Sequence, residues 1–300
     1  MTVPPLIRLA TRPTPLARAQ SALVVRWLRA LGPDLQVEIV PIRSAGDVDQ
    51  TRPIEALGRG AFAKAVQAAL LDGRADLAVH SFKDLPTTPA LDLTVAAVPV
   101  RADPRDVLVA GPIRSVAALP HGAVVGTDSP RRRTQLALQR PDVVFVPIRG
   151  SVETRVRKVA DGTVAATVLA RAGLERAGLA QAISAVLEPP DFLPAPAQGA
   201  LAVETRATDI VLRRLVERID DPAARAATTA ERAFLRTLEG GCSVPAGALA
   251  TLDGARLSLQ AGVYEPTGAR FVSLTGDAAA AEELGRQAAE YLLARVAHTP

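Results

Sequence analysis

Three consecutive arginines stand where a helix is expected to begin. In the segment TDSPRRRTQ, Ser129 and Pro130 predict an N-cap and a first helical position, which places Arg131, Arg132 and Arg133 in the first turn. Cations are disfavoured there because the N-terminus of a helix already carries a partial positive charge. A bound anion would compensate the arginines. The alternative is that all three side chains extend into solvent.

A second basic group lies in the segment PIRGSVETRVRK, which also runs from an expected strand into a helix. Arg149 follows the strand, and Arg155 lies about one and a half turns into the helix. Only three of the 35 basic residues are lysines, and a general preference for arginine accounts for many of the others. Clusters are different, since the guanidinium fork binds carboxylates and phosphates through two hydrogen bonds. If two domains present such clusters to a shared cleft, the ligand should carry several negative charges.

Asp84 stands at a position that suits a group that accepts or donates protons. Lys83 and Asp84 in the segment HSFKDLP follow a buried-looking strand and precede Pro86, which prevents a helix from incorporating them. A surface salt bridge between the two is the plain alternative. As a functional group, Asp84 would be a carboxylate among cations, able to accept a proton or to stabilise a developing positive charge.

Cys242 is the only cysteine of the chain, and it stands between two glycines and a proline in the segment LEGGCSVPAG. It cannot form an intrachain disulfide. The glycines favour a tight loop that a bulky group can approach. The alternative is a free, half-buried thiol at a helix end.

The histidines exclude metal and triad chemistry. His80, His121 and His298 are the only three, and they supply neither a zinc site nor a Ser-His-Asp triad. We therefore expect no metal. His80 is expected to be a strand residue whose hydrogen bonds are satisfied by the backbone.

The composition narrows the class of protein. The chain has 300 residues, 48% of them apolar, and a net charge of +4, which suits two or three domains with their own cores. Aromatic residues make up 3%, too few for stacking on bases, so nucleic acid is a weak candidate for a partner. We expect no membrane partner, because no stretch has the length of a membrane span. The N-terminus has no signal-peptide pattern, which together with the single cysteine predicts a cytoplasmic protein.

The elements that must position these residues follow from hydrophobic periodicity. Short apolar runs alternate with helical patterns up to about residue 180, as expected for the βαβ units of open α/β sheets. The predicted strands are 6–11, 37–42, 75–82, 106–110, 123–128, 143–148 and 164–170, and the predicted helices are near 15–30, 61–72, 129–140 and 151–161. Ligands of such sheets bind beyond the carboxyl ends of the strands, where the polar residues of this chain collect.

The last third of the chain has a different pattern. Helical patterns cover 208–220 and 222–241, alternating residues at 248–276 predict a small antiparallel sheet, and residues 278–296 predict a closing amphipathic helix. Proline-bearing breaks at 98–106 and 188–199 indicate domain junctions. The segment 44–60 has no periodicity and is long for a connection, which favours a lid or a binding loop.

Taken together, these segments resemble the hydroxymethylbilane synthases, also called porphobilinogen deaminases. The similarity covers nearly the whole chain, in order: ATRPTPLARAQ, RADLAVHSFKDLP, DPRD, GTDSPRRRTQ, RPDVVFVPIRGSVETR, AGLERAGL, PAPAQGALAVETR and TAERAFLRTLEGGCSVP. The resemblance implies two doubly wound α/β domains like those of a two-lobed solute-binding protein, and a small α+β C-terminal domain. Domain 1 would be residues 1–98 with 196–215, domain 2 residues 99–195, and domain 3 residues 216–300. The chain would return to domain 1 after the junction near 196.

The resemblance also implies a reaction. A dipyrromethane cofactor would be attached to Cys242 through a thioether, so that the cysteine is an anchor and not a nucleophile. Four molecules of porphobilinogen would be condensed onto it with loss of ammonia, and water would release the linear tetrapyrrole. Asp84 would assist the loss of ammonia, stabilise the azafulvene-like cation and take the proton released after the terminal pyrrole attacks. The chain would be a monomeric transferase of heme biosynthesis.

The roles of the other site residues follow from the same resemblance. The cofactor would be held by Ser81, Lys83, Thr127, Ser129, Arg131, Arg132 and Arg155. The incoming substrate would be bound by Arg12, Thr14, Gln20, Arg149, Gly150, Arg176 and Gln198. Arg59 and Phe62 would belong to the lid.

The sequence departs from the family's pattern at several positions. The lid reads LGRGAF, with Arg59 in place of a lysine and one glycine fewer. Asp128 and Pro130 interrupt the usual Ser-Ser-Leu before the arginines, and Ser151 replaces a common asparagine. These departures concern the lid and the rate of the reaction, since Asp84, the arginine clusters and the cysteine persist.

Two other classes of function compete with this enzyme. A non-enzymatic two-lobed binding protein for an anionic metabolite would explain the arginines, but it needs neither Asp84 nor Cys242. A nucleic-acid binder is the more distant alternative, and it predicts an affinity that falls steeply with salt.

Overall fold

The computed structural model describes residues 6–32, 34–43, 60, 63–239 and 245–294. The chain forms two compact units: unit 1 is Met1–Ala102 with Ala200–Arg225, and unit 2 is Asp103–Gly199 with Ala226–Pro300. Three of the predicted site residues, Arg59, Phe62 and Cys242, lie outside the described residues.

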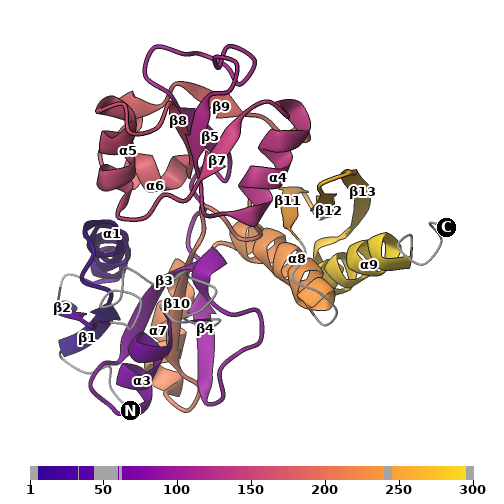
Figure 1. The fold of residues 1–300 in the computed structure, drawn as a ribbon. Helices are drawn as coiled ribbons and strands as arrows, with labels where there is room; N and C mark the ends of the chain where they lie inside the picture. The colour runs from indigo at the N-terminus through magenta and orange to yellow at the C-terminus, as the bar shows by residue number, and fades with distance from the viewer. Residues whose placement is uncertain (1–5, 33, 44–59, 61–62, 240–244, 295–300) are drawn as a thin grey trace. The chain divides into compact units, whose positions relative to one another are not determined.

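Unit 1 is built on a five-stranded mixed sheet with the order β2-β1-β3-β10-β4. β1 (Leu6–Thr11) pairs in parallel with β2 (Gln36–Pro41) and β3 (Leu77–Ser81). β10 (Leu201–Arg206) is antiparallel to both of its neighbours, β3 and β4 (Leu93–Ala97). A strand from beyond residue 200 therefore lies in the middle of a sheet whose other strands end before residue 100 (Figure 1).

Helices cover both faces of this sheet. α1 (Pro15–Leu31) and α7 (Ile210–Val216) bury Val24, Leu28 and Leu212 with strand residues of one face, among them Leu9 and Leu77. α3 (Lys64–Leu71) buries its own apolar residues with Ala10 and Ala78, which point to the other face because side chains alternate along a strand. Two 3-10 turns, η2 (Phe82–Asp84) and η4 (Glu217–Ile219), complete the unit.

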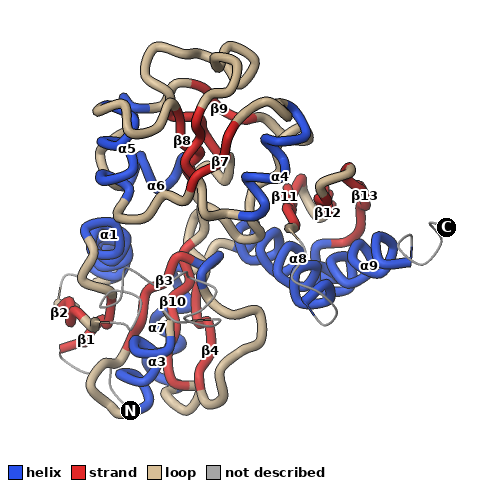
Figure 2. The backbone as a smooth tube through the Cα atoms, viewed as in Figure 1, coloured by secondary structure: helices blue, strands red, loops and turns tan. Residues whose placement is uncertain are grey.

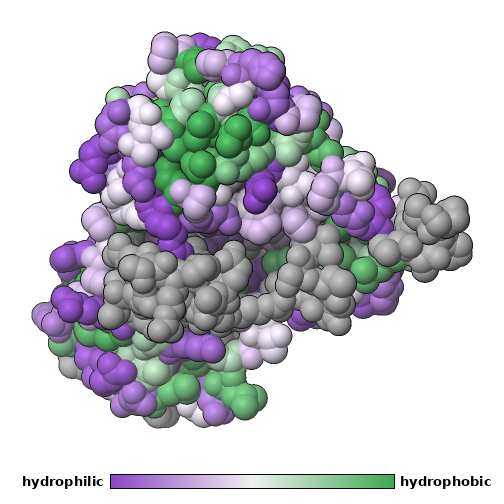
Figure 3. Space-filling view, viewed as in Figure 1, coloured by the Kyte–Doolittle hydropathy of each residue, from purple (hydrophilic) through white to green (hydrophobic). Residues whose placement is uncertain are grey.

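The first sheet of unit 2 has the order β7-β6-β8-β5-β9. β6 (Val124–Gly126) is parallel to β7 (Val144–Val146) and β8 (Ala166–Ala170), whereas β5 (Asp106–Val109) is antiparallel to β8 and β9 (Ala185–Leu187). α4 (Pro130–Gln139), α5 (Val152–Ala160), α6 (Arg171–Arg176) and η3 (Ala180–Ala182) follow the strands (Figure 2). Figure 3 shows apolar atoms gathered over this sheet on the face in view.

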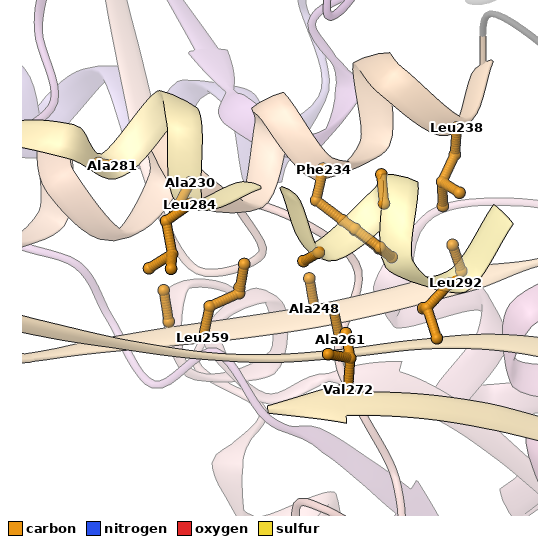
Figure 4. Close-up of a cluster of buried hydrophobic side chains, with 14 of the residues drawn as sticks. Ala230, Phe234, Leu238, Ala248, Leu259, Ala261, Val272, Ala281, Leu284 and Leu292 are labelled. Atoms are coloured by element: carbon orange, nitrogen blue, oxygen red, sulfur yellow. The ribbon is translucent and has the colours of Figure 1, made fainter. Parts of the chain in front are cut away.

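The second sheet of unit 2 is antiparallel, with the order β11-β12-β13. Its strands are β11 (Ala246–Asp253), β12 (Arg256–Glu265) and β13 (Gly268–Asp277), followed by η5 (Ala278–Ala280). α8 (Pro222–Glu239) and α9 (Ala281–Ala294) pack on one face of the sheet through Phe234, Leu259 and Leu292 (Figure 4). The two helices touch at Gly285, where an added Cβ would meet the Ala230 carbonyl oxygen at 2.1 Å, so only glycine permits this approach.

The predicted fold class is confirmed: two α/β sheets covered by helices and a small α+β region at the C-terminal end. Both α/β sheets are mixed, however, because each includes an antiparallel strand, β10 or β5. The sequence reasoning did not predict β4, β9, β10 or α6. No helix of the described residues is long and apolar enough to cross a membrane. The shared cleft expected from the sequence concerns the relation of the two units and stays a prediction.

Asp76, directly before β3, makes an ion pair in unit 1 with several hydrogen bonds. Its carboxylate accepts hydrogen bonds from the Arg8 backbone N–H at 2.9 Å, from the Arg8 guanidinium at 2.8 and 3.1 Å, and from Arg206 at 3.3 Å. Burial alone would raise the pKa of Asp76, but the bonds from Arg8 and Arg206 hold it below the ordinary value of 3.8. The stabilisation is therefore complete well above this value and is lost as the pH falls through the folded pKa.

We predict that Asp76→Asn flattens the pH dependence of thermal unfolding on the acid side. The melting temperature of the wild type should fall between about pH 5 and pH 3, and part of that fall should disappear in the variant because the titrating group is gone. Asp72→Asn is the control, since Asp72 pairs with Arg74 on the surface with both side chains more than half exposed. Parallel curves for the wild type and Asp76→Asn would contradict the assignment.

Candidate active site

In unit 1, strand β3 ends in the turn that carries the predicted proton-handling acid. β3 ends at Ser81, and η2 follows with Phe82, Lys83 and Asp84. Phe82 is buried and its N–H donates to the Ala200 carbonyl at 3.0 Å, which fixes the turn to the chain that enters β10. Asp84 is exposed, and Lys83 is half-buried.

Several predicted site residues of unit 1 come together around this turn. The amide of Gln20 exchanges hydrogen bonds with the Ser81 hydroxyl, at 2.8 and 3.2 Å. A hollow of about 30 Å³ is lined by Arg12, Gln20, Ser81 and Asp84, together with His80. Thr14 instead caps α1, where its hydroxyl accepts from the Ala17 N–H at 3.3 Å.

His80 is a strand residue of β3, as predicted. Its Nε2 makes no hydrogen bond to a backbone group of the described residues; it lies 3.0 Å from a carboxylate oxygen of Glu204 on β10, without hydrogen-bond geometry. The Gln67 amide of α3 donates to the same carboxylate at 3.1 and 3.2 Å. All three side chains are buried. Glu204 was not predicted, because its partners are far away in the sequence.

In unit 2, the predicted start of α4 is confirmed. Ser129 is the N-cap, its hydroxyl accepts from the Arg132 N–H at 3.4 Å, and Pro130 is the first helical residue. The Thr127 hydroxyl accepts from the Ser129 N–H at 3.2 Å, so both predicted hydroxyl residues shape the entry to the helix. Arg133 is exposed and its guanidinium lies 5.8 Å from the centre of the Phe145 ring.

Arg131 and Arg132 do not extend into solvent. Their side chains are 7% and 10% exposed, and they bind the two oxygens of Asp106 at 2.8 and 2.7 Å. Gln198 donates to the same carboxylate at 3.0 Å and to the Pro104 carbonyl at 2.8 Å, and Arg131 donates to the Leu193 carbonyl at 2.5 Å. The solvent alternative is therefore wrong for these two arginines, and a carboxylate of the chain itself compensates part of their charge. The sequence reasoning missed Asp106, although it is the last residue of the quoted DPRD segment.

This cluster carries more positive than negative charge. Among the described residues, Asp106 is the acid that pairs with both guanidinium groups, so one carboxylate faces two cations. Burial lowers the pKa of Arg131, and the charge of Arg132 lowers it further, although Asp106 acts in the opposite direction. A second anion at this site would relieve that excess charge.

Two of the other predicted site arginines of unit 2, Arg155 and Arg176, donate to backbone carbonyls. The Arg155 guanidinium donates to the Gly150 carbonyl at 3.0 Å. Gly150 has a φ of +110°, and an added Cβ would lie 2.8 Å from Thr154, so this turn requires glycine. Arg176 donates to the Gly199 carbonyl at 2.7 Å, and burial lowers its pKa to about 10, which leaves it charged at neutral pH. Arg149 is half-buried, directly before Gly150.

One further acid was missed by the sequence reasoning. Glu231 of α8 is fully buried, and its two oxygens accept from the backbone N–H groups of Ala197 at 2.6 Å and Ala250 at 2.8 Å. Ala197 has a φ of +61°, which an alanine rarely adopts. Glu231 therefore holds the backbone directly before Gln198 in a fixed conformation. The described residues contain no cluster of three or more histidine, cysteine or acidic side chains suited to a metal.

Family models match almost the full length of the chain. Residues 7–214 match the model described as porphobilinogen deaminase, dipyromethane cofactor binding domain, and residues 226–294 match the one described as porphobilinogen deaminase, C-terminal domain. The chain belongs to the porphobilinogen deaminase family. The membership confirms the predicted activity, that of a transferase of the hydroxymethylbilane synthase type in tetrapyrrole biosynthesis.

Individual relatives agree over their whole length. The porphobilinogen deaminase of Roseiflexus castenholzii is 47% identical over 290 residues, which cover 96% of this chain and 95% of that protein. The porphobilinogen deaminase of Xanthomonas oryzae pv. oryzae is 44% identical over 289 residues, 95% of each chain. Among solved structures, the methionine binding protein MetQ is 12% identical with a TM-score of 0.47, over 72% of this chain and 90% of that chain.

We predict that Asp106→Asn lowers the free energy of unfolding by about 3–5 kcal/mol, because two buried guanidinium groups then face one another without a carboxylate. Urea unfolding of the purified protein measures this loss. Glu282→Gln is the control, since it breaks an exposed pair with Arg236 and should cost less than about 1 kcal/mol. Equal effects of the two substitutions would contradict the buried network.

Proposed function

We propose that Asp84 handles the protons of the hydroxymethylbilane synthase reaction and that the arginines of unit 2 hold carboxylates of the cofactor. The observation that carries this proposal is the buried cluster in which Asp106 compensates only one of the two charges of Arg131 and Arg132. An acid-bearing pyrrole is the kind of ligand that would supply the missing anion.

The chain's residues fit a dipyrromethane cofactor. Its carboxylates would be held by the residues predicted for it from the sequence, which are Ser81, Lys83, Thr127, Ser129, Arg131, Arg132 and Arg155. When bound, the group supplies the nucleophilic pyrrole to which the substrate is joined. We propose that Cys242 anchors it through a thioether, on the grounds of the resemblance and because the chain has no other cysteine.

Substrate binding is assigned to a second set of residues. Porphobilinogen carries an acetate and a propionate, and the side chains proposed to receive it are Arg12, Thr14, Gln20, Arg149, Arg176 and Gln198, with the backbone of Gly150. The Arg12, Gln20 and Asp84 side chains line one hollow of unit 1. A carboxylate-binding arginine and the proton-handling acid are therefore neighbours. Arg59 and Phe62 are proposed as lid residues.

Asp84 meets the requirements of the proton-handling step. The protonated amino group of porphobilinogen leaves as ammonia when its C–N bond breaks; the bonding electrons go with the nitrogen, and the methylene carbon stays on the pyrrole. A positive charge then develops on the substrate pyrrole, which the exposed Asp84 carboxylate would stabilise. An oxygen of Asp84 would also accept the proton that the attacking pyrrole carbon releases once the new carbon–carbon bond has formed.

The family membership decides between the competing functions. A non-enzymatic binding protein for an anionic metabolite has no use for Asp84 or Cys242. The two family models cover the parts of the chain that contain these residues, 7–214 and 226–294. The cytoplasmic location and the monomeric state expected from the sequence stay predictions.

We predict that Asp84→Asn lowers turnover of porphobilinogen by at least about a hundredfold, which is the typical contribution of a general acid or base. Asparagine keeps the shape of the side chain but has no charge to stabilise the cation and no basic oxygen. Turnover is measured from the tetrapyrrole product, and intact mass checks that the variant still carries the cofactor.

Asp92→Asn is the matched control. Asp92 is an exposed acid of unit 1 with a φ of +62°, a conformation that asparagine tolerates. Its turnover should equal that of the wild type. Wild-type turnover by Asp84→Asn would remove Asp84 from the mechanism, and an inactive wild type would remove the proposed function.

A further inference from the structure

A buried carboxylate links three elements behind the turn that carries Asp84. The side chain of Glu204 on β10 is 4% exposed; Gln67 of α3 donates hydrogen bonds to its two carboxylate oxygens at 3.2 and 3.1 Å, and Nε2 of His80 on β3 lies 3.0 Å from one of them without hydrogen-bond geometry. A buried carboxylate is costly unless such partners satisfy it. None of the three residues has a role in the proposed mechanism.

The network lies at the functional end of the sheet. In the β3–β10 pairing, His80 is opposite Ala202 and Glu204 is opposite Ala78, so His80 and Glu204 are diagonal neighbours on one face of the sheet. Ala78 packs under α3 on that face. His80 also borders the hollow that Asp84 and Arg12 line. The network therefore lies directly behind the acid that handles the protons.

The start of α3 also packs against the chain that follows Asp84. Gly60 has a φ of +72°, and an added Cβ would lie 2.8 Å from the ring of Pro86. The Gly60 carbonyl accepts from the N–H groups of Ala63 and Lys64 at 2.9 Å, which joins it to the helix. Gln67 then ties this helix to the end of β3 through Glu204. On the opposite face, Gln20 of α1 holds Ser81.

We infer that Glu204, through His80 and Gln67, is a positioning residue that fixes the Asp84 turn against α3. The inference rests on the proposed role of Asp84. It assigns to Glu204 an effect on the chemical step rather than on substrate affinity, since Glu204 is buried and does not line the hollow with the substrate-binding side chains.

The same two strands offer a matched control. At the other end of β3, Asp76 binds Arg206 of β10 at 3.3 Å and Arg8 of β1 at 2.8 Å. Its side chain is 11% exposed. If Glu204 served only to hold the strands together, Glu204→Gln and Asp76→Asn should affect activity alike.

The test compares the holoenzymes of the wild type, Glu204→Gln and Asp76→Asn. Each is checked for cofactor by intact mass and for folding by thermal unfolding, and kcat and KM for porphobilinogen are measured. We expect Glu204→Gln to lower kcat by about tenfold or more with KM changed less than about twofold, because displacements near 1 Å reduce rates by up to about a hundredfold. Asp76→Asn should lose stability but keep its kcat.

His80→Gln provides the second measurement, also in case Glu204→Gln fails to fold. It should lower kcat by a similar factor. The double variant Glu204→Gln/His80→Gln should have a kcat no lower than that of the slower single variant, because the effects of substitutions in one network are not additive. A folded Glu204→Gln or His80→Gln with the wild-type kcat would overturn the inference, as would an equal loss of kcat in Asp76→Asn. An inactive wild type would instead overturn the proposed function on which it rests.

Discussion

The Asp106 carboxylate is shared between two buried guanidinium groups, and much of unit 2 is arranged around this contact. Asp106 begins β5, Arg131 and Arg132 lie in the first turn of α4, and Gln198 lies in the segment of unit 2 that follows β9. Burial of charges is costly unless they are paired and hydrogen-bonded, so these segments can adopt their positions only together. Glu231 adds a further constraint, because it holds the backbone at Ala197 and links it to β11 through Ala250.

The same contact explains a departure from the usual rules for helices. Arginines at a helix N-terminus oppose its dipole, yet here two of them are buried and one carboxylate cannot neutralise both. The start of α4 is therefore locally unfavourable, and a second anion would balance its excess positive charge. Under the proposed function, this excess positive charge would be matched by the carboxylates of a pyrrole ligand. In unit 1, the exposed acid Asp84 lies on a turn next to Ser81, whose hydroxyl is held by Gln20 of α1.

The elements that the sequence predicted are those encoded locally. β1, β2, β3 and β5 to β8 follow from short apolar runs, and α4 begins at Ser129 because an N-cap and a proline are local signals. β10 could not be derived in this way, since its place between β3 and β4 depends on pairing across more than a hundred residues; the resemblance implied only that the chain returns to domain 1 after the junction near 196. β4 (Leu93–Ala97) and β9 (Ala185–Leu187) were not predicted, and their length does not explain this, since the predicted β6 and β7 have only three residues each.

The same division separates the predicted site residues from the missed ones. Asp84 and the arginines stand out because their types are unusual for the ends of strands and helices. Asp106, Glu204 and Glu231 do not, because a single acid in an apolar segment shows its importance only through partners that are 26, 137 and 34 residues away. For the same reason the position of His80 Nε2 beside Glu204, 3.0 Å away, could not be predicted.

The central claim is that the carboxylates of the cofactor match the excess positive charge beside Asp106. The most direct test compares the melting temperature of holo-protein with that of apo-protein, made as Cys242→Ser. The mass of each form is confirmed first. The account predicts that apo-protein melts about 5 °C or more below holo-protein, because each charge-assisted hydrogen bond contributes about 1.5–3 kcal/mol. Added phosphate should recover part of the difference by binding at the start of α4. Equal melting temperatures of the two forms, with no response to phosphate, would contradict it.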